Sequence, residues 1–121
     1  MSKYMNMKIT KADRISVFKD QISEAKWLAN EAIRLNPDDG GTANFDCALV
    51  KLEKGFTYAE FCKVFEDMGL HTSKGSGYDK GYIHVMNYSA GEGNRNTLWA
   101  RTFAKSLEEG GFKTSMYYQV D

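Results

Sequence analysis

The chain has 121 residues, 42% of them hydrophobic and 13% aromatic, and its 16 basic and 16 acidic residues give a formal net charge of zero. This composition excludes an intrinsically disordered protein, and the length fits a single domain that buries a real hydrophobic core. A protein that binds nucleic acid by charge alone carries a basic excess, so nucleic acid is not an expected partner.

The two cysteines, Cys47 and Cys62, are expected to be reduced core thiols, because no Cys-x-x-Cys pair is present. His71 and His84 are the only histidines, so we expect no structural zinc site, and no cofactor is indicated. No stretch approaches the roughly 18 apolar residues of a membrane span, and the N-terminus lacks an apolar signal core. We therefore expect a cytoplasmic protein without a membrane partner, in which residues 1–9 fray.

The first predicted element is a long helix over residues 10–35. Thr10 followed by Asp13 is typical of a helix start, and Asn36-Pro37 ends the pattern. Between them runs one stripe of apolar or small residues, namely Ile15, Phe18, Ile22, Ala25, Ala29 and Ala32. At 1.5 Å per residue the helix would be about 39 Å long, longer than a small sheet. Two interpretations stay open: the helix covers the sheet, or part of the stripe packs against a second copy in a homodimer.

The rest of the chain predicts four strands and two helices. The ranges are a strand at 43–52, a helix at 57–68, a hairpin of strands at 70–74 and 82–88, a helix at 97–109 and a strand at 112–120. This order favours a ferredoxin-like βαββαβ sheet of the α+β class, so residues 1–121 form one domain with its core at 42–121. Right-handed crossovers then give the strand order fourth, first, third, second.

This topology brings three polar segments together. The first strand lies between the third and fourth and runs opposite to both, so its start meets their ends. The segments are 38–46, 87–97 and 117–121, and they are rich in Asn, Gly, Asp and Tyr. The ligand-binding residues predicted there are Asp39, Thr42, Asn44, Asp46, Asn87, Tyr88, Asn94, Arg95, Asn96, Thr97, Tyr118 and Gln119. The alternative is that turn chemistry alone explains these residue types.

Two residues carry the expected chemistry of this edge. Arg95 lies in a Gly-rich run that opens a helix, where free N–H groups and a guanidinium favour an anion. The run matches neither a Walker loop nor a dinucleotide fingerprint, and Asn96 could instead be the helix cap with Arg95 a surface charge. Asp46 heads an apolar row and needs a partner to stay charged, for which Arg95 is a candidate; otherwise it is solvated.

The strand at 82–88 places His84 on one face with Tyr82, Met86 and Tyr88. A face lined by Tyr and His can stack a base. The alternative is that the long N-terminal helix covers it.

At the three polar segments the chain resembles small uncharacterised proteins encoded by phages and prophages. The shared runs are Asp-Gly-Gly-Thr-x-Asn-Phe-Asp at residues 39–46, Gly-Asn-Arg-x-Thr at 93–97 and Tyr-Tyr-Gln-x-Asp at 117–121. The resemblance covers about the last two-thirds of the chain and leaves out the long helix. It implies a setting in which small proteins act against host defences, by sequestering a nucleotide messenger or by blocking an effector.

Three functions follow, of which the first is favoured. It is a non-catalytic binding module for a small anionic ligand, a nucleotide above all. The second is a protein-binding inhibitor of a host defence effector, similar in action to an anti-CRISPR protein, with Tyr78 and Tyr117 as anchors. The third is a small Mg²⁺-dependent hydrolase that uses Asp39, Asp46 and Asp121. The sequence offers no nucleophile–base pair, so we name no catalytic residue and no resident metal.

Overall fold

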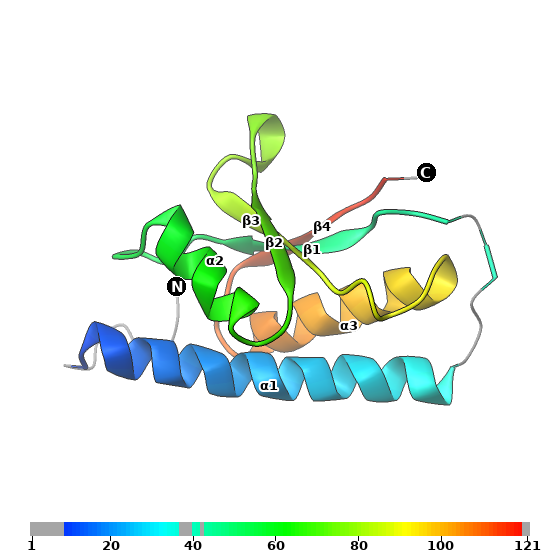
Figure 1. The fold of residues 1–121 in the computed structure, drawn as a ribbon, viewed down its shortest axis with the longest axis horizontal. Coiled ribbons are helices and arrows are strands. Elements are labelled where there is room, and N and C mark those ends of the chain that lie inside the picture. The colour runs from blue at the N-terminus through cyan, green and yellow to red at the C-terminus, as the bar shows by residue number, and fades with distance from the viewer. Residues whose placement is uncertain (1–8, 37–39, 42, 120–121) are drawn as a thin grey trace.

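The computed structural model describes residues 9–36, 40–41 and 43–119. Within them, three α-helices and one short 3-10 helix accompany a four-stranded antiparallel sheet (Figure 1). In chain order the elements are α1 (Lys11–Leu35), β1 (Cys47–Lys51), α2 (Tyr58–Glu66), β2 (His71–Lys74), η1 (Gly77–Asp79), β3 (Tyr82–Met86), α3 (Asn94–Glu109) and β4 (Thr114–Tyr117). The α+β class and the long N-terminal helix predicted from the sequence are confirmed.

Helix α1 begins with the predicted capping box. The Thr10 hydroxyl accepts the Asp13 N–H at 3.1 Å, and the Asp13 carboxylate accepts the Thr10 N–H at 3.1 Å. The buried face of α1 consists of Phe18, Ile22, Ala25, Ala29 and Ile33. It ends on Ile33 rather than on the expected Ala32, because alternating steps of three and four average about 3.5 residues, slightly less than the helical turn of about 3.6, so the buried position moves forward along the helix.

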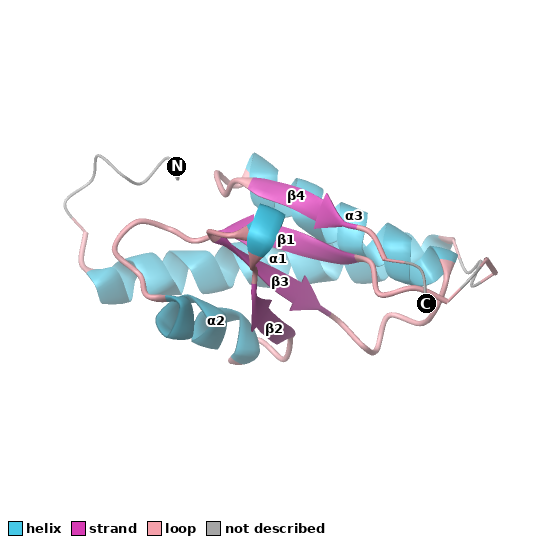
Figure 2. Cartoon of the chain, turned by 90° about the horizontal axis from the view of Figure 1, so that it is seen from above, coloured by secondary structure: helices cyan, strands magenta, loops and turns pink. Residues whose placement is uncertain are grey.

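Helix α1 does not lie on the sheet. It packs chiefly against α3 and touches α2, which themselves cover one face of the sheet (Figures 1 and 2). Phe18 of α1 shows this arrangement, since its ring lies 6.2 Å from Phe61 of α2 and 4.9 Å from Phe112 before β4. The expectation that α1 covers the sheet is therefore wrong, and α1 forms an outer layer behind the two shorter helices.

The strands are arranged in the order β2-β3-β1-β4, and every neighbouring pair is antiparallel. Read from the other edge, the order is β4-β1-β3-β2. β1 and β4 are shorter than the predicted ranges of 43–52 and 112–120. Beyond them the pairing continues as a hydrogen bond from the Phe45 N–H to the Gln119 carbonyl at 2.7 Å. Polar side chains supply the remaining contacts there, which is why the ladder stops early.

The two faces of the sheet differ in what covers them. Ala48 and Val50 of β1 and Ile83 and Val85 of β3 are buried in the core that α1, α2 and α3 complete. The opposite face carries no α-helix among the described residues; η1 alone stands in front of it (Figure 2). The expectation that α1 covers the His84 face is thus also wrong.

Side chains of neighbouring strands cover part of the open face. The ring of His84 stacks on Tyr117 with centroids 4.8 Å apart, and His84 Nε2 lies 3.3 Å from the Asp79 carboxylate of η1.

Cys47 is paired with Tyr117 across the ladder and is only 2% exposed. Burial, with the charges of Asp46 and Asp79, raises the pKa of the Cys47 thiol to about 12, so it stays protonated and unreactive.

Both cysteines are free, but only Cys47 is buried, and Cys62 lies partly exposed at the border of the core rather than inside it. Among the described residues no helix combines the length and apolarity that crossing a membrane requires.

Candidate ligand site at the converged sheet edge

The three polar segments meet at one end of the sheet, where β1 begins, β3 leads into α3 and the chain leaves β4 (Figure 1). The Asn94 N–H donates to the Gly40 carbonyl at 2.9 Å, which joins the first segment to the second. The hydrogen bond from Phe45 to Gln119 joins the first to the third. Segments about fifty and seventy residues apart therefore share one edge, as an antiparallel β1 between β3 and β4 requires.

Asp46 is the central connection of this edge. One carboxylate oxygen accepts the Thr97 hydroxyl at 2.8 Å, and the other accepts the Gln119 N–H at 2.8 Å. The predicted partnership of Asp46 with Arg95 is wrong, because Arg95 Nε donates to the Ala90 carbonyl at 3.3 Å. The reason is the start of α3, which begins three residues earlier than predicted and turns Thr97 toward β1.

Asn44 and Asn96 complete a polar cluster around Asp46. Asn96 Nδ2 donates to Asn44 Oδ1 at 2.7 Å and to the Asp46 carbonyl at 3.0 Å. Asn44 Nδ2 in turn donates to the Gly93 carbonyl at 3.1 Å. Asn96 is therefore not the helix cap: Gly93 takes that position with a left-handed φ of 56°, and Asn96 lies inside the first turn.

The contacts of Arg95 are structural. A Cβ atom on Gly91, whose φ is 108°, would come within 3.0 Å of Arg95 Nε, so the β3–α3 loop folds directly onto this side chain. Because the Asn94 N–H is already taken by Gly40, the start of α3 offers fewer free donors to an anion than its sequence suggested. The described contacts give no support to Arg95 as an anion clamp.

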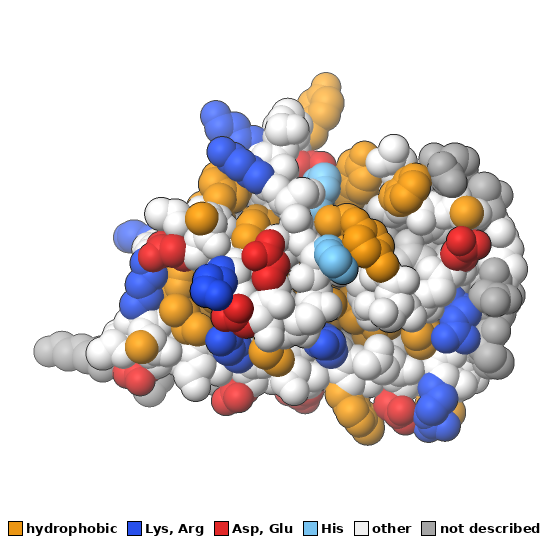
Figure 3. Space-filling model, viewed as in Figure 1, with side chains coloured by type: hydrophobic (Ala, Val, Ile, Leu, Met, Phe, Trp, Pro, Cys, Tyr) orange, Lys and Arg blue, Asp and Glu red, His pale blue; other side chains and the backbone are white. Residues whose placement is uncertain are grey.

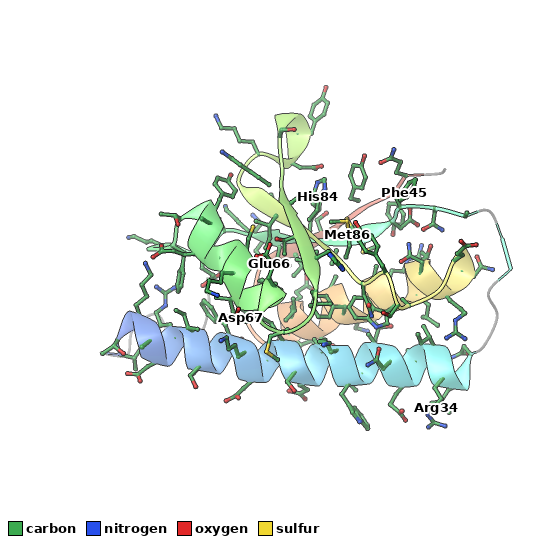
Figure 4. The ribbon with its side chains drawn as sticks, in the orientation of Figure 1. Arg34, Phe45, Glu66, Asp67, His84 and Met86 are labelled. Carbon is green, nitrogen blue, oxygen red and sulfur yellow. The ribbon has the colours of Figure 1, made fainter. Side chains whose placement is uncertain are left out.

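A hollow of about 190 Å³ opens beside the polar cluster. Its rim carries two exposed aromatic side chains, Phe45 at 53% and Tyr88 at 67% exposed. Figure 4 shows Phe45 close to Met86, and Figure 3 shows hydrophobic side chains gathered at this end of the sheet beside histidines. The lining residues are Asn44, Phe45, Asp46, Met86, Asn87, Tyr88, Gly91, Glu92 and Asn96. None of them is basic.

Polar groups of the hollow differ in whether they are already bonded. Both carboxylate oxygens of Asp46 are in use. Asn87 Oδ1 accepts the Ser89 N–H at 3.0 Å, which fixes the amide orientation and leaves its Nδ2 without an acceptor among the described residues. The Glu92 carboxylate and Asn96 Oδ1 likewise accept no hydrogen bond from the described part of the chain. As far as the described residues show, the hollow therefore offers two acceptors and one donor beside its exposed rings.

Comparisons of this chain with protein-family models, with curated proteins and with solved structures find no match. The chemistry of the site is thus the basis for its interpretation.

The remaining predicted residues lie at the margin of the hollow or beyond it. The Tyr118 hydroxyl accepts Arg101 Nε at 3.2 Å, and the Gln119 side chain accepts the Tyr117 hydroxyl at 2.7 Å. Asp39 and Thr42 lie outside the described residues, as does Asp121 of the hydrolase alternative. In the described ranges no three His, Cys, Asp or Glu side chains are grouped so as to hold a metal.

Sequence analysis missed four residues of the hollow, namely Phe45, Met86, Gly91 and Glu92. The signal for Phe45 was present, because an apolar residue between Asn44 and Asp46 at the start of a strand points away from both. For Glu92 there was none, since its position depends on the path of the loop.

Proposed function

We propose that this chain is a non-catalytic binding module whose ligand is a nucleotide, held with its base in the hollow. The observation that carries the proposal is the combination of two exposed rings, Phe45 and Tyr88, with polar atoms in the same hollow that are bonded to none of the described residues. A base that stacks on an aromatic side chain gains about 1–3 kcal/mol. The polar groups then select among bases by hydrogen bonding.

The phosphate of such a ligand lies outside the hollow. No Lys or Arg is among the lining residues, and Asp46 and Glu92 make the interior acidic, so a phosphate inside would be repelled. The base rather than the charge therefore supplies the affinity, which revises the role expected for Arg95. Capture of a nucleotide messenger in this way is consistent with the counter-defence setting that the resemblance to phage proteins implies.

Isothermal titration of the chain with the four common ribonucleoside monophosphates tests this function. We expect binding of at least one of them and a Kd at least tenfold weaker in Tyr88→Ala, because the substitution removes one wall of the hollow. Tyr78→Ala is the matched control, since Tyr78 is a fully exposed tyrosine in η1 and does not line the hollow. Absence of heat for all four nucleotides would remove the proposal.

A second candidate, a protein-binding inhibitor of a host effector, is favoured by the open face of the sheet. That face carries the stacked His84 and Tyr117 and continues to the exposed Tyr78 in η1. Exposed tyrosines at the centre of a face are typical anchors of protein interfaces. For this second function we expect the two variants to exchange roles. Tyr78→Ala weakens capture of the partner protein from a host lysate, and Tyr88→Ala binds nucleotide no differently from the unmodified chain.

For the fold we propose the ferredoxin-like class. Support comes from the strand order β4-β1-β3-β2, from the antiparallel pairing of all neighbours and from α2 and α3 as the two crossovers on one face. Helix α1 is then an addition that covers these crossover helices.

A further inference from the structure

Glu92 differs from the other acidic residue of the hollow. Each oxygen of the Asp46 carboxylate already accepts a hydrogen bond, from Thr97 or from Gln119, so Asp46 holds the structure together. The Glu92 side chain is exposed, lines the hollow and is bonded to none of the described residues. A free carboxylate at the wall of a ring-lined hollow is suited to a ligand that presents two parallel N–H donors.

We infer that the hollow selects guanine over the other bases and that Glu92 is the residue that recognises it; this rests on the proposed nucleotide-binding function. Guanine presents its N1–H and N2–H groups side by side, and the two carboxylate oxygens can accept both. Adenine presents an unprotonated nitrogen at the same place, whose lone pair would face the carboxylate. Cytosine has the same disadvantage, and uracil offers one N–H between two carbonyl oxygens.

Two further groups of the hollow, bonded to none of the described residues, fit the rest of the guanine edge. Asn96 Oδ1 is an acceptor for the second hydrogen of the N2 amino group. Asn87 Nδ2 is a donor for O6, which lies on the far side of N1 from the amino group. A hollow with acceptors alone would serve any donor-rich ligand, whereas acceptors together with a donor match an edge that carries both.

An arginine side chain from a protein partner presents a similar pair of donors. It carries no acceptor, so it would leave Asn87 Nδ2 unused, and its guanidinium covers less of the exposed rings of Phe45 and Tyr88 than a purine does. The lining therefore favours guanine, and arginine becomes an outcome that the experiment must separate.

The test compares GMP, IMP, AMP and N-acetyl-arginine amide by isothermal titration. IMP keeps the N1–H of guanine and lacks the amino group. We expect GMP to bind at least tenfold more tightly than AMP, with IMP between them, because AMP covers the Glu92 carboxylate without supplying the two donors that guanine presents, and IMP supplies one of them. In Glu92→Gln we expect the preference for GMP over AMP to fall to about twofold or less, without weaker binding of AMP.

Glu24→Gln is the matched control, since Glu24 is an exposed glutamate on α1 outside this hollow and should leave the preference unchanged. Equal binding of GMP and AMP would overturn the inference and leave the nucleotide-binding function standing. No nucleotide binding at all, with binding of the arginine amide that Glu92→Gln abolishes, would overturn both and favour a protein partner. Because Glu92 is exposed, an unchanged thermal unfolding curve of Glu92→Gln verifies that the variant is folded.

Discussion

Asp46 joins α3 and the chain after β4 to the start of β1 through two hydrogen bonds to one carboxylate. Hydrogen bonds to a charged group contribute about 1.5–3 kcal/mol, and Asp46 is partly screened by solvent. We expect Asp46→Ala to lower the free energy of unfolding by about 2 kcal/mol, measured by urea denaturation at pH 7. Thr97→Val should lose a part of the same amount, because it removes only one of the two donors.

The control for this prediction is Asp20→Ala, an exposed carboxylate of α1 without a hydrogen bond to any described residue. Its effect should stay within about 0.5 kcal/mol. Equal stability of Asp46→Ala and the unmodified chain would show that solvent replaces both hydrogen bonds, and the converged edge would then have no structural anchor.

A buried ion pair connects α1 to the turn after β1. Glu53 is only 4% exposed, and its carboxylate lies 3.5 Å from the Arg14 guanidinium, whose Nη1 also donates to the Lys54 carbonyl at 2.8 Å. Burial raises the pKa of the Glu53 carboxyl, and the charge of Arg14 lowers it by a smaller amount. The ionised form of Glu53 is therefore less favourable in the folded chain than in the unfolded chain.

The raised pKa fixes the sign of a pH effect. Below the unfolded pKa, near 4.5, Glu53 is protonated in both states and its contribution to stability is complete. As the pH rises through the folded pKa, that contribution is lost. We expect the stability of Glu53→Gln, relative to the unmodified chain, to increase between pH 4 and pH 7 in urea denaturation. A constant difference over this range would show that Arg14 fully offsets the cost of burying the charge.

At the scale of single residues, the sequence predicted hydrogen bonds between residues close together in the chain and missed those between residues far apart in it. The capping box expected at Thr10 depends on residues three positions apart and is present, and Thr57 with Glu60 forms a second one at the start of α2. The partner of Asp46 depended on where α3 begins. Successive helical residues point about 100° apart. Because α3 begins three residues earlier than predicted, Thr97 rather than Arg95 points toward Asp46 and donates its hydrogen bond.

Among the elements, α1 owes its position to aromatic packing with three other parts of the chain. The ring centroid of Phe18 lies 5.4 Å from Phe56, 6.2 Å from Phe61 and 4.9 Å from Phe112. Truncation of a core phenylalanine costs about 3–5 kcal/mol, through lost burial and the cavity that remains. We expect Phe18→Ala to lose this amount in urea denaturation and to loosen α1 first, seen as faster amide hydrogen exchange along that helix.

Trp27→Ala is the matched control on the same helix, because Trp27 is a large apolar residue that is 62% exposed. We expect it to change the free energy of unfolding by less than about 0.5 kcal/mol. A similar loss for both variants would mean that the outer face of α1 is also covered, either by another part of the chain or by a second copy.

The pattern of α1 predicted its existence, its length and the face it buries. It could not predict what that face packs against, since a stripe of spacing three and four fits a sheet, a helix or a second copy equally well. The same limit applies to β1 and β4. Their sequences predicted strands, but the ends of these strands depend on whether Asn44, Asp46 and Gln119 bond through side chains or through the ladder.

On the scale of the whole molecule, the layer order separates a closed side from an open one. The sheet, the pair α2 and α3, and then α1 follow one another, so the outer face of the sheet carries no α-helix of the described chain (Figures 1 and 2). The hollow opens where this face meets the converged edge, since Met86 belongs to both. Any ligand there is thus bound on the side where the fold leaves side chains uncovered.

The same layer order bears on the oligomeric state that we expect. Five stripe residues of α1, from Phe18 to Ile33, face the core of their own chain, so we expect the dimer contact considered from the sequence not to use this stripe. The apolar residues left on α1, namely Trp27, Leu28 and Leu35, are few and stand among charged side chains such as Glu31 and Arg34. Stable homodimers usually bury a larger and more continuous apolar surface.

We therefore expect light scattering after gel filtration at micromolar concentration to give the mass of a single chain. Twice that mass, returning to one chain in Trp27→Ser, would instead place a dimer contact on the outer face of α1.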